Sequence, residues 1–281
     1  MRIVITGGKG QLGQELVRAL GAHDLHPLGR SELDIEDPRA VQTIVDIRPD
    51  AVIHAAALTD VDACERDPVW AQRVNVEGTR HVADAVHRLG ARLVYISTDF
   101  VFDGTKQAPY TEEDQPNPLS AYGRSKLEGE QVARRYVPAA LVVRTAWLYA
   151  AGSRNFVTAI LRLAREKRIL PVVTDQVGSP TWARDLAEVI GGLVDRRAAG
   201  IVHAAGQGAC SRFELAHAIV ALAGVDAEVV PTTSDKFPRP ARRPAYCPLA
   251  QHRLNALGLS IPHWAESLKA CVKPLGGTDR A

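Results

Sequence analysis

The sequence predicts an α/β fold in which helices cover both faces of a parallel sheet. Three observations lead to this prediction. Short apolar runs alternate with helical patterns through the first half of the chain, and the first run passes directly into a glycine-rich loop. The 281 residues are also enough to bury a large core. We expect this doubly wound sheet to be followed by a smaller C-terminal lobe.

The composition excludes several classes of function. The net charge is only +2 and no dense basic stripe accompanies it, so we expect no nucleic-acid partner. No apolar run approaches the roughly 20 residues of a membrane span, and a strand predicted at residues 2–6 leaves no room for a signal peptide. The cysteines fit no metal-ligand spacing. We therefore expect a cytoplasmic protein with reduced thiols and no membrane association.

The first predicted strand ends in a loop typical of dinucleotide binding. Its sequence is Gly7-Gly8-Lys9-Gly10-Gln11-Leu12-Gly13, and a helical apolar pattern follows it. Positions without side chains let the backbone approach a pyrophosphate, while the helix N-terminus offers it free N–H groups. A plain glycine turn is the alternative. The flanking strand and helix favour a Rossmann-type site that includes Gly7, Gly10 and Gly13.

The second predicted strand, 25–28, is followed by Arg30 and Ser31. Many NAD-binding folds carry a carboxylate here, whereas a guanidinium and a hydroxyl suit a 2′-phosphate. We therefore predict a preference for NADPH through Arg30, with a surface role for Arg30 as the alternative. Residues 33–35 are expected to form a third short strand, with Asp34 and Ile35 at the cofactor. Asp34 would accept a hydrogen bond from adenine or cap the next helix.

The next apolar run, residues 50–57, is predicted to be a buried strand. It ends in small residues, over which a cofactor can lie. We interpret His54 as a hydrogen-bonded core residue. Residues 58–62 form a loop at the ligand edge, and the long helix predicted at 68–89 contains Asn75. That residue makes either a core hydrogen bond or a contact with solvent.

The candidate catalytic residues follow the next strand, 91–97. Thr98 comes where this strand ends, the position at which an open α/β sheet binds its substrate. Tyr122 and Lys126 are four residues apart on a helix predicted at 119–136, so they share one face. An ammonium beside a phenol is expected to lower the pKa of Tyr122. Such a group can donate the proton that a carbonyl oxygen needs during hydride reduction.

These motifs resemble the extended short-chain dehydrogenase/reductase superfamily. The resemblance rests on the glycine loop, on His54-Ala55-Ala56-Ala57 and on the Tyr122/Lys126 pair. Four further segments are similar to the dTDP-4-dehydrorhamnose reductase family: 97–104, 144–149, 175–181 and 239–244. That family implies reduction of the 4-keto group of a 6-deoxyhexose on dTDP, giving dTDP-L-rhamnose in the last step of its biosynthesis. Phe100 stands where the family usually has a tyrosine.

The resemblance also implies roles for individual residues. Tyr122 is the proton donor, Lys126 binds the nicotinamide ribose, Thr98 completes the triad, and Thr98 and Asp99 contact the sugar. Trp147 lines the sugar pocket, with a core position as its alternative. The other implied cofactor contacts are Gly10, Gln11 and Leu12 at the pyrophosphate and Ala57, Leu58 and Thr59 under the nicotinamide.

The second half of the chain is expected to complete the cleft. We assign residues 1–150, with a returning segment at about 182–205, to the NAD(P)-binding Rossmann domain. Residues 151–181 and 206–281 are assigned to the substrate-binding lobe, with residues 276–281 frayed. Arg242, Arg243 and Asn155 are candidates for binding the dTDP phosphates, because guanidinium groups suit phosphate. A solvent-facing basic turn at Arg242 and Arg243 is the alternative.

Two other classes of function stay open at this point. A nucleotide-sugar epimerase or dehydratase could use the same Tyr–Lys pair, although no glutamate follows Thr98 as dehydratases need. A non-catalytic binding protein on the same fold is the other alternative. The sequence identifies no metal-binding residue. It leaves open whether Mg²⁺ lies at a subunit contact, whether NADH replaces NADPH, and whether the chain forms a homodimer.

Overall fold

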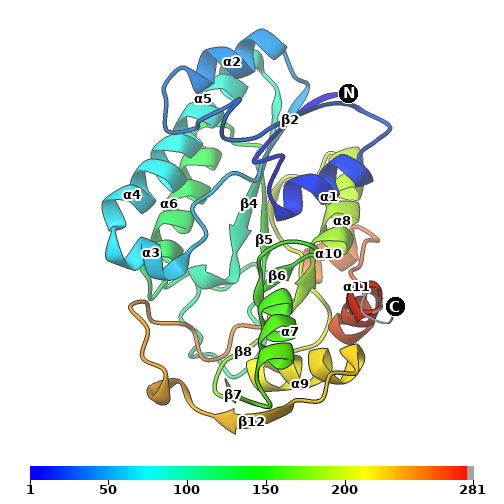
Figure 1. Cartoon of the computed structure of the whole chain (residues 1–281). Coiled ribbons are helices and arrows are strands. Elements are labelled where there is room, and N and C mark those ends of the chain that lie inside the picture. Colours follow the sequence, from blue (N-terminus) through cyan, green and yellow to red (C-terminus); the bar gives the residue numbers. More distant parts are fainter. Residues whose placement is uncertain (277–281) are drawn as a thin grey trace.

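A six-stranded parallel sheet forms the centre of the protein, with strand order β10-β5-β4-β3-β1-β2 (Figure 1). Its strands are β1 (Arg2–Thr6), β2 (Asp24–Leu28), β3 (Ala51–His54), β4 (Arg92–Thr98), β5 (Leu141–Thr145) and β10 (Gly200–His203). The structure is a computed structural model that describes residues 1–276. The end that we expect to be frayed therefore lies outside the described residues from 277 onward.

Alternating side chains direct the two faces of this sheet into separate apolar clusters. Ile3 and Ile5 of β1 belong to one cluster and Val4 to the other. The first cluster is covered by α1 (Gln11–Ala19) and α8 (Ala183–Asp195). The second is covered by α2 (Ala40–Ile47), α5 (Gly78–Leu89) and α6 (Ala121–Tyr136). The sheet is thus covered on both faces, and the predicted doubly wound α/β class is confirmed.

The segment at 33–35 is a loop, so the predicted third strand is wrong. Leu33 and Ile35 are each 5% exposed and pack into the second cluster, which explains why the segment is apolar. The carbonyl oxygen of Ile35 lies 2.8 Å from Nδ1 of His81 and not beside a strand. Side-chain burial and this contact hold the loop without any ladder of backbone hydrogen bonds.

The helical stretch predicted at 68–89 is present but not uniform. It consists of α4 (Pro68–Gln72), the π-helical η1 (Arg73–Glu77) and α5, and it follows α3 (Val61–Arg66). A π-helical turn admits one extra residue per turn and often marks a functional site. Here it contains Asn75, whose side chain is buried.

The later elements surround a third apolar cluster, which is built mainly from α7 (Phe156–Glu166), α9 (Arg212–Ala223) and α11 (Trp264–Gly276). Figure 1 shows these helices below the large sheet, near the short strands β7, β8 and β12. The family-like segment at 175–181 carries two short strands, β8 and the start of β9. The elements are β6 (Leu148–Tyr149), α7 (Phe156–Glu166), β7 (Ile169–Val173), β8 (Val177–Gly178), β9 (Thr181–Trp182), β11 (Cys210–Ser211), α9 (Arg212–Ala223), β12 (Glu228–Thr232), η3 (Ser234–Lys236), α10 (His252–Ala256) and α11 (Trp264–Gly276).

Within the described residues, no helix is long and apolar enough to cross a bilayer. The four cysteines, all of which the structure describes, are buried and form no disulfide.

Candidate active site

A cavity of about 710 Å³ lies where the strands of the large sheet end. The chain leaving β1, β3, β4 and β5 contributes to its wall, as expected for an open parallel sheet. The predicted site residues that line this one cavity are Gly7, Gly10, Gln11, Leu12, Gly13, Arg30, Asp34, Ile35, Ala57, Leu58, Thr59, Thr98, Asp99, Tyr122, Lys126, Trp147, Asn155 and Arg243. Arg242 is not among the lining residues.

The glycine loop lines the cavity and packs so closely against protein backbone that two of its glycines have no room for a side chain. Gly7 has a φ of +69°, and a Cβ there would lie 2.8 Å from the backbone nitrogen of Ala56. A Cβ on Gly13 would lie 2.3 Å from the carbonyl oxygen of Gly7. Gly10 is the N-cap of α1 and offers no side chain to its first N–H groups. An uncapped helix N-terminus at a cavity wall fits a pyrophosphate.

Charged side chains surround the far end of the cavity. Arg30 is exposed, and its Nη2 lies 2.9 Å from Oε1 of Glu36 while its Nε lies 3.6 Å from Oδ2 of Asp34. Asp34 accepts a hydrogen bond from the backbone N–H of Glu36 and does not cap α2. The capping role for Asp34 is therefore wrong, whereas its contact with adenine stays a prediction.

Two buried polar residues make hydrogen bonds around the end of β3, and one of them, Asn75, holds the loop that follows. Asn75 accepts a hydrogen bond from the Leu58 N–H at 2.8 Å and donates to the Leu58 carbonyl oxygen at 3.1 Å. The ring nitrogens of His54 lie 2.7 Å from the Thr6 hydroxyl and 3.1 Å from the Thr79 hydroxyl. Burial lowers the pKa of His54 to about 3, so the ring is neutral. His54 is the core residue that we expected, and Asn75 makes the core hydrogen bonds.

Helix α6 presents Tyr122 and Lys126 to the same cavity that Thr98 reaches from β4. The helix starts where Ser120 Oγ accepts a hydrogen bond from the Gly123 N–H. Thr98, Tyr122 and Lys126 are 6%, 8% and 3% exposed, so all three are nearly enclosed by protein. The sequence spacing and the strand end thus bring the three candidate catalytic residues together.

The pKa of Tyr122 is raised, contrary to the expectation from sequence. Burial disfavours the phenolate, and this effect exceeds the opposing hydrogen bond from Thr98. Lys126 does not contribute to the shift in this structure. A raised pKa keeps the phenol protonated at neutral pH, which is the form that a proton donor requires.

Lys126 is a buried cation whose pKa burial lowers to about 7. Its Nζ lies 4.2 Å from the ring centroid of Tyr95, a cation–π contact. Attraction to Glu130 partly opposes the shift. Glu130 itself is held by Arg144 through two hydrogen bonds of 2.9 and 2.8 Å, with both side chains almost fully buried.

A second group of side chains lines the cavity beside Thr98. Arg212 lies over the ring of Trp147, with 3.4 Å between Cζ and the ring centroid, and 4.8 Å from that of Phe156. Trp147 has a φ of +44°, an unusual backbone conformation for a bulky residue. Burial raises the pKa of Asp99 to about 7, although the nearby positive charge of Arg212 lowers it in part. Burial lowers the pKa of Arg212 to about 10.

The Pro- and Arg-rich segment separates its two arginines. Arg243 is directed into the cavity and forms an ion pair with Asp62, at 3.0 Å between Nη2 and Oδ2. Arg242 is exposed to solvent. Asn155 lines the cavity and also caps α7, where its side chain accepts from the Thr158 N–H at 3.1 Å and donates to Gln11 at 3.0 Å.

Sequence reasoning missed Arg212 and Asp62. The sequence predicts the helix at 211–223, which is α9 in the structure. Ser211 and Glu214 form a capping box at its start, and this Ser-x-x-Glu pattern was the signal that marks Arg212 as its first residue. No local signal links Asp62 to Arg243, because the two positions are far apart in the chain.

Comparison with known proteins places these observations in a family. Residues 1–276 match the family described as the RmlD substrate binding domain. A dTDP-4-dehydrorhamnose reductase of Mycobacterium tuberculosis is 43% identical, over 96% of this chain and 92% of that protein. A solved dTDP-4-dehydrorhamnose reductase from Clostridium acetobutylicum has a TM-score of 0.95 and 40% identity, covering 98% of this chain and 99% of that one. A solved dTDP-4-dehydrorhamnose reductase from Bacillus anthracis, in complex with NADP, has a TM-score of 0.93 and 39% identity, covering 96% of this chain and 98% of that one.

Proposed function

This chain belongs to the RmlD substrate binding domain family, and from that membership we propose that it is a dTDP-4-dehydrorhamnose reductase. The reaction is the NADPH-dependent reduction of the 4-keto group of dTDP-4-dehydro-6-deoxy-L-mannose to dTDP-L-rhamnose. One observation of the structure carries the proposal. Thr98, Tyr122 and Lys126 line the same cavity as the glycine loop, so a proton donor and a dinucleotide cradle share one space.

The cofactor is assigned to the wall made by β1, α1 and the loop after β3. The pyrophosphate fits against Gly10, Gln11 and Leu12, because the α1 N-terminus is uncapped there. Ala57, Leu58 and Thr59 line the part of the wall that we assign to the nicotinamide. When bound, the reduced nicotinamide supplies the hydride.

Arg30 is the residue that we assign to the 2′-phosphate, in agreement with the NADP in the related structure from Bacillus anthracis. Its guanidinium is exposed and is paired with Glu36 across 2.9 Å. An exposed ion pair of this kind is worth about 1 kcal/mol or less, so a phosphate can replace the carboxylate. Arg30→Ala should therefore raise the KM for NADPH far more than the KM for NADH, and equal changes would refute the assignment.

Tyr122 is assigned the transfer of a proton to the sugar O4. Its raised pKa keeps the proton in place until the oxygen becomes a strongly basic alkoxide. Thr98 lines the cavity near the phenol, and its hydroxyl donates to Asp99 Oδ1 at 3.0 Å. We assign this hydroxyl to orienting the same sugar oxygen, for which it turns away from Asp99. Lys126 is assigned to the nicotinamide ribose hydroxyls. Its ammonium can turn from the Tyr95 ring toward such acceptors at the cost of one cation–π contact.

The nucleotide half of the substrate is assigned to the arginines across the cleft. Arg243 and Arg212 both line the cavity, and both are held in place, by Asp62 and by the Trp147 ring respectively. Guanidinium groups fixed in this way suit two phosphates. Both arginines come from residues 206–281. We keep 151–181 and 206–281 as the substrate-binding lobe beside a Rossmann domain at 1–150 and about 182–205.

Arg242 is the matched control for this assignment. It adjoins Arg243 in sequence but is exposed and does not line the cavity. Arg243→Ala and Arg212→Ala should raise the KM for the dTDP-sugar by at least about tenfold, the loss of one charged hydrogen bond. Arg242→Ala should leave the KM unchanged. A similar increase for all three variants would place the phosphates elsewhere.

The decisive assay follows NADPH absorbance with freshly made dTDP-4-dehydro-6-deoxy-L-mannose. We expect one NADPH to be oxidised for each keto sugar that is consumed. An epimerase or dehydratase would convert nucleotide sugars without net NADPH oxidation, and a binding protein would not turn over at all. Either outcome would defeat the reductase proposal. Size-exclusion chromatography with light scattering decides whether the homodimer that the sequence leaves open exists.

A further inference from the structure

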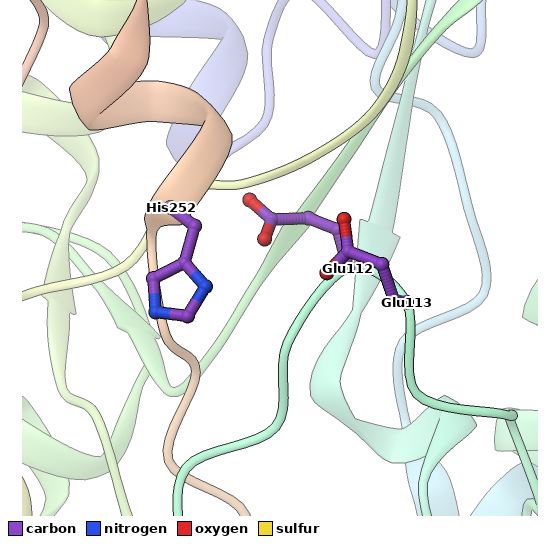
Figure 2. A group of neighbouring side chains, drawn as sticks. All are labelled: Glu112, Glu113 and His252. Carbon is purple, nitrogen blue, oxygen red and sulfur yellow. The ribbon is translucent and has the colours of Figure 1, made fainter.

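Three side chains with metal-binding chemistry gather outside the active-site cavity. They are Glu112, Glu113 and His252, whose ligand atoms all lie within 4.8 Å of one another. Figure 2 shows the two carboxylates and the imidazole, with the Glu112 side chain extending toward His252. None of the three lines the active-site cavity, so the substrate does not explain them.

Glu112 carries a buried oxygen that no group in the described part of the chain satisfies. The residue is only 8% exposed, and its Oε1 accepts the backbone N–H groups of His203 and Arg253, each at 3.2 Å. Its Oε2 is buried and finds no hydrogen-bond partner within residues 1–276. Leaving a buried carboxylate oxygen without a partner is unfavourable, and such atoms call for a specific explanation. A bound cation would satisfy this oxygen.

Backbone pairing holds the two parts of this cluster together. The Tyr110 N–H donates to the Pro248 carbonyl oxygen at 2.8 Å, and the Ala250 N–H donates to the Tyr110 carbonyl oxygen at 2.8 Å. Glu112 and Glu113 follow directly on one side of this pairing, and His252 follows on the other. The fold therefore brings the three side chains near one another.

We propose that Glu112, Glu113 and His252 form a binding site for a divalent transition-metal ion, with Zn²⁺ as the best fit. An imidazole nitrogen with two carboxylate oxygens is a donor set that suits Zn²⁺, whereas Mg²⁺ and Ca²⁺ favour oxygen ligands alone. Glu112 Oε2 is the free ligand atom, because Oε1 is engaged with the backbone. Three protein ligands leave room for water on the ion.

The role of this ion is structural. It joins the loop at 110–114 to the segment that runs from Arg243 to α10, and so supports the part of the chain that positions Arg243 in the cleft. Because the ion binds only the folded arrangement, Zn²⁺ should raise the melting temperature in proportion to the logarithm of its concentration.

The test uses the full-length protein stripped with EDTA, with ZnCl2 or MgCl2 as the probe. Isothermal titration and thermal melting are compared for wild type, His252→Ala and Glu113→Gln. His87→Ala is the matched control, because His87 is an exposed histidine on α5, outside the cluster. Glu112 is left intact, since it also accepts two backbone N–H groups.

We expect one Zn²⁺ per chain in wild type and His87→Ala, with a higher melting temperature than for the EDTA-treated protein. His252→Ala and Glu113→Gln should bind Zn²⁺ at least about tenfold more weakly. Equal Zn²⁺ affinity in wild type and His252→Ala would overturn the site. Mg²⁺ binding as tight as that of Zn²⁺ would overturn the role of the imidazole. An unchanged melting temperature in excess Zn²⁺ would mean that no folded-state site exists, with water satisfying Glu112.

Discussion

Replacing Lys126 by methionine should make the protein more stable and at the same time inactive. Lys126 is 3% exposed, and burial lowers its pKa from 10.5 to about 7. A buried cation that lowers stability is expected where its charge serves the chemistry of a site. The same substitution therefore tests both the electrostatics of the site and the assignment of Lys126 to catalysis.

The expected gain in stability comes from the energy of carrying a buried charge. A fall in pKa of this size corresponds to about 5 kcal/mol. The variant loses the cation–π contact with the Tyr95 ring, worth up to about 2 kcal/mol, although a methionine sulfur against the same ring recovers part of it. We therefore expect Lys126→Met to be more stable than wild type by about 3 kcal/mol at pH 7.

The pH dependence gives this effect a distinctive sign. Between about pH 7 and pH 10.5 the unfolded chain keeps the proton that folded Lys126 has released, so the unfolded state binds more protons. The free energy of unfolding of wild type therefore rises with pH relative to that of Lys126→Met. The advantage of the variant is complete below pH 7 and disappears as pH approaches 10.5.

Urea unfolding followed by circular dichroism at several pH values measures this difference, and NADPH oxidation measures activity. Activity should fall by at least about 100-fold, because a misplaced cofactor loses alignment with the substrate. A variant that is less stable than wild type at pH 7 would refute the desolvation account. Full activity in a stable variant would refute the catalytic role.

Three further substitutions test other parts of the site. Tyr122→Phe should lower kcat by about 10²–10⁴-fold, measured by NADPH oxidation, with unchanged NADPH affinity in a fluorescence titration; near-normal kcat would remove Tyr122 as the proton donor. Glu130→Gln should lower the free energy of unfolding, measured with urea, by about 3 kcal/mol, because it leaves the Arg144 cation buried without a full counter-charge. An unchanged urea midpoint of unfolding would contradict this. Asp99, whose pKa is about 7 in the folded state, binds a proton that the unfolded chain has lost between about pH 4 and pH 7. Wild type should therefore lose stability relative to Asp99→Asn as pH rises through that window, and parallel stability curves would contradict the raised pKa.

The local sequence determined the fold class of this protein and the candidate catalytic residues. Short apolar runs, the glycine loop and the four-residue spacing of Tyr122 and Lys126 are all local patterns, and local geometry decides which residues share a face. Thr98 was predictable for a related reason, since residues that follow strands of a parallel sheet meet at one edge. The one false strand, at 33–35, has the apolar composition of a strand but uses it to anchor a loop.

Only the tertiary structure decided the electrostatics and the partners. Lys126 lies over Tyr95 and Tyr122 has a raised pKa because segments far apart in the chain remove both from water. Arg243 lies in the cavity and Arg242 outside it because Asp62, far away in the sequence, pairs with one of two adjacent arginines. Spacing along the chain determines which side chains point the same way, whereas burial and ion pairing depend on what the rest of the chain places against them.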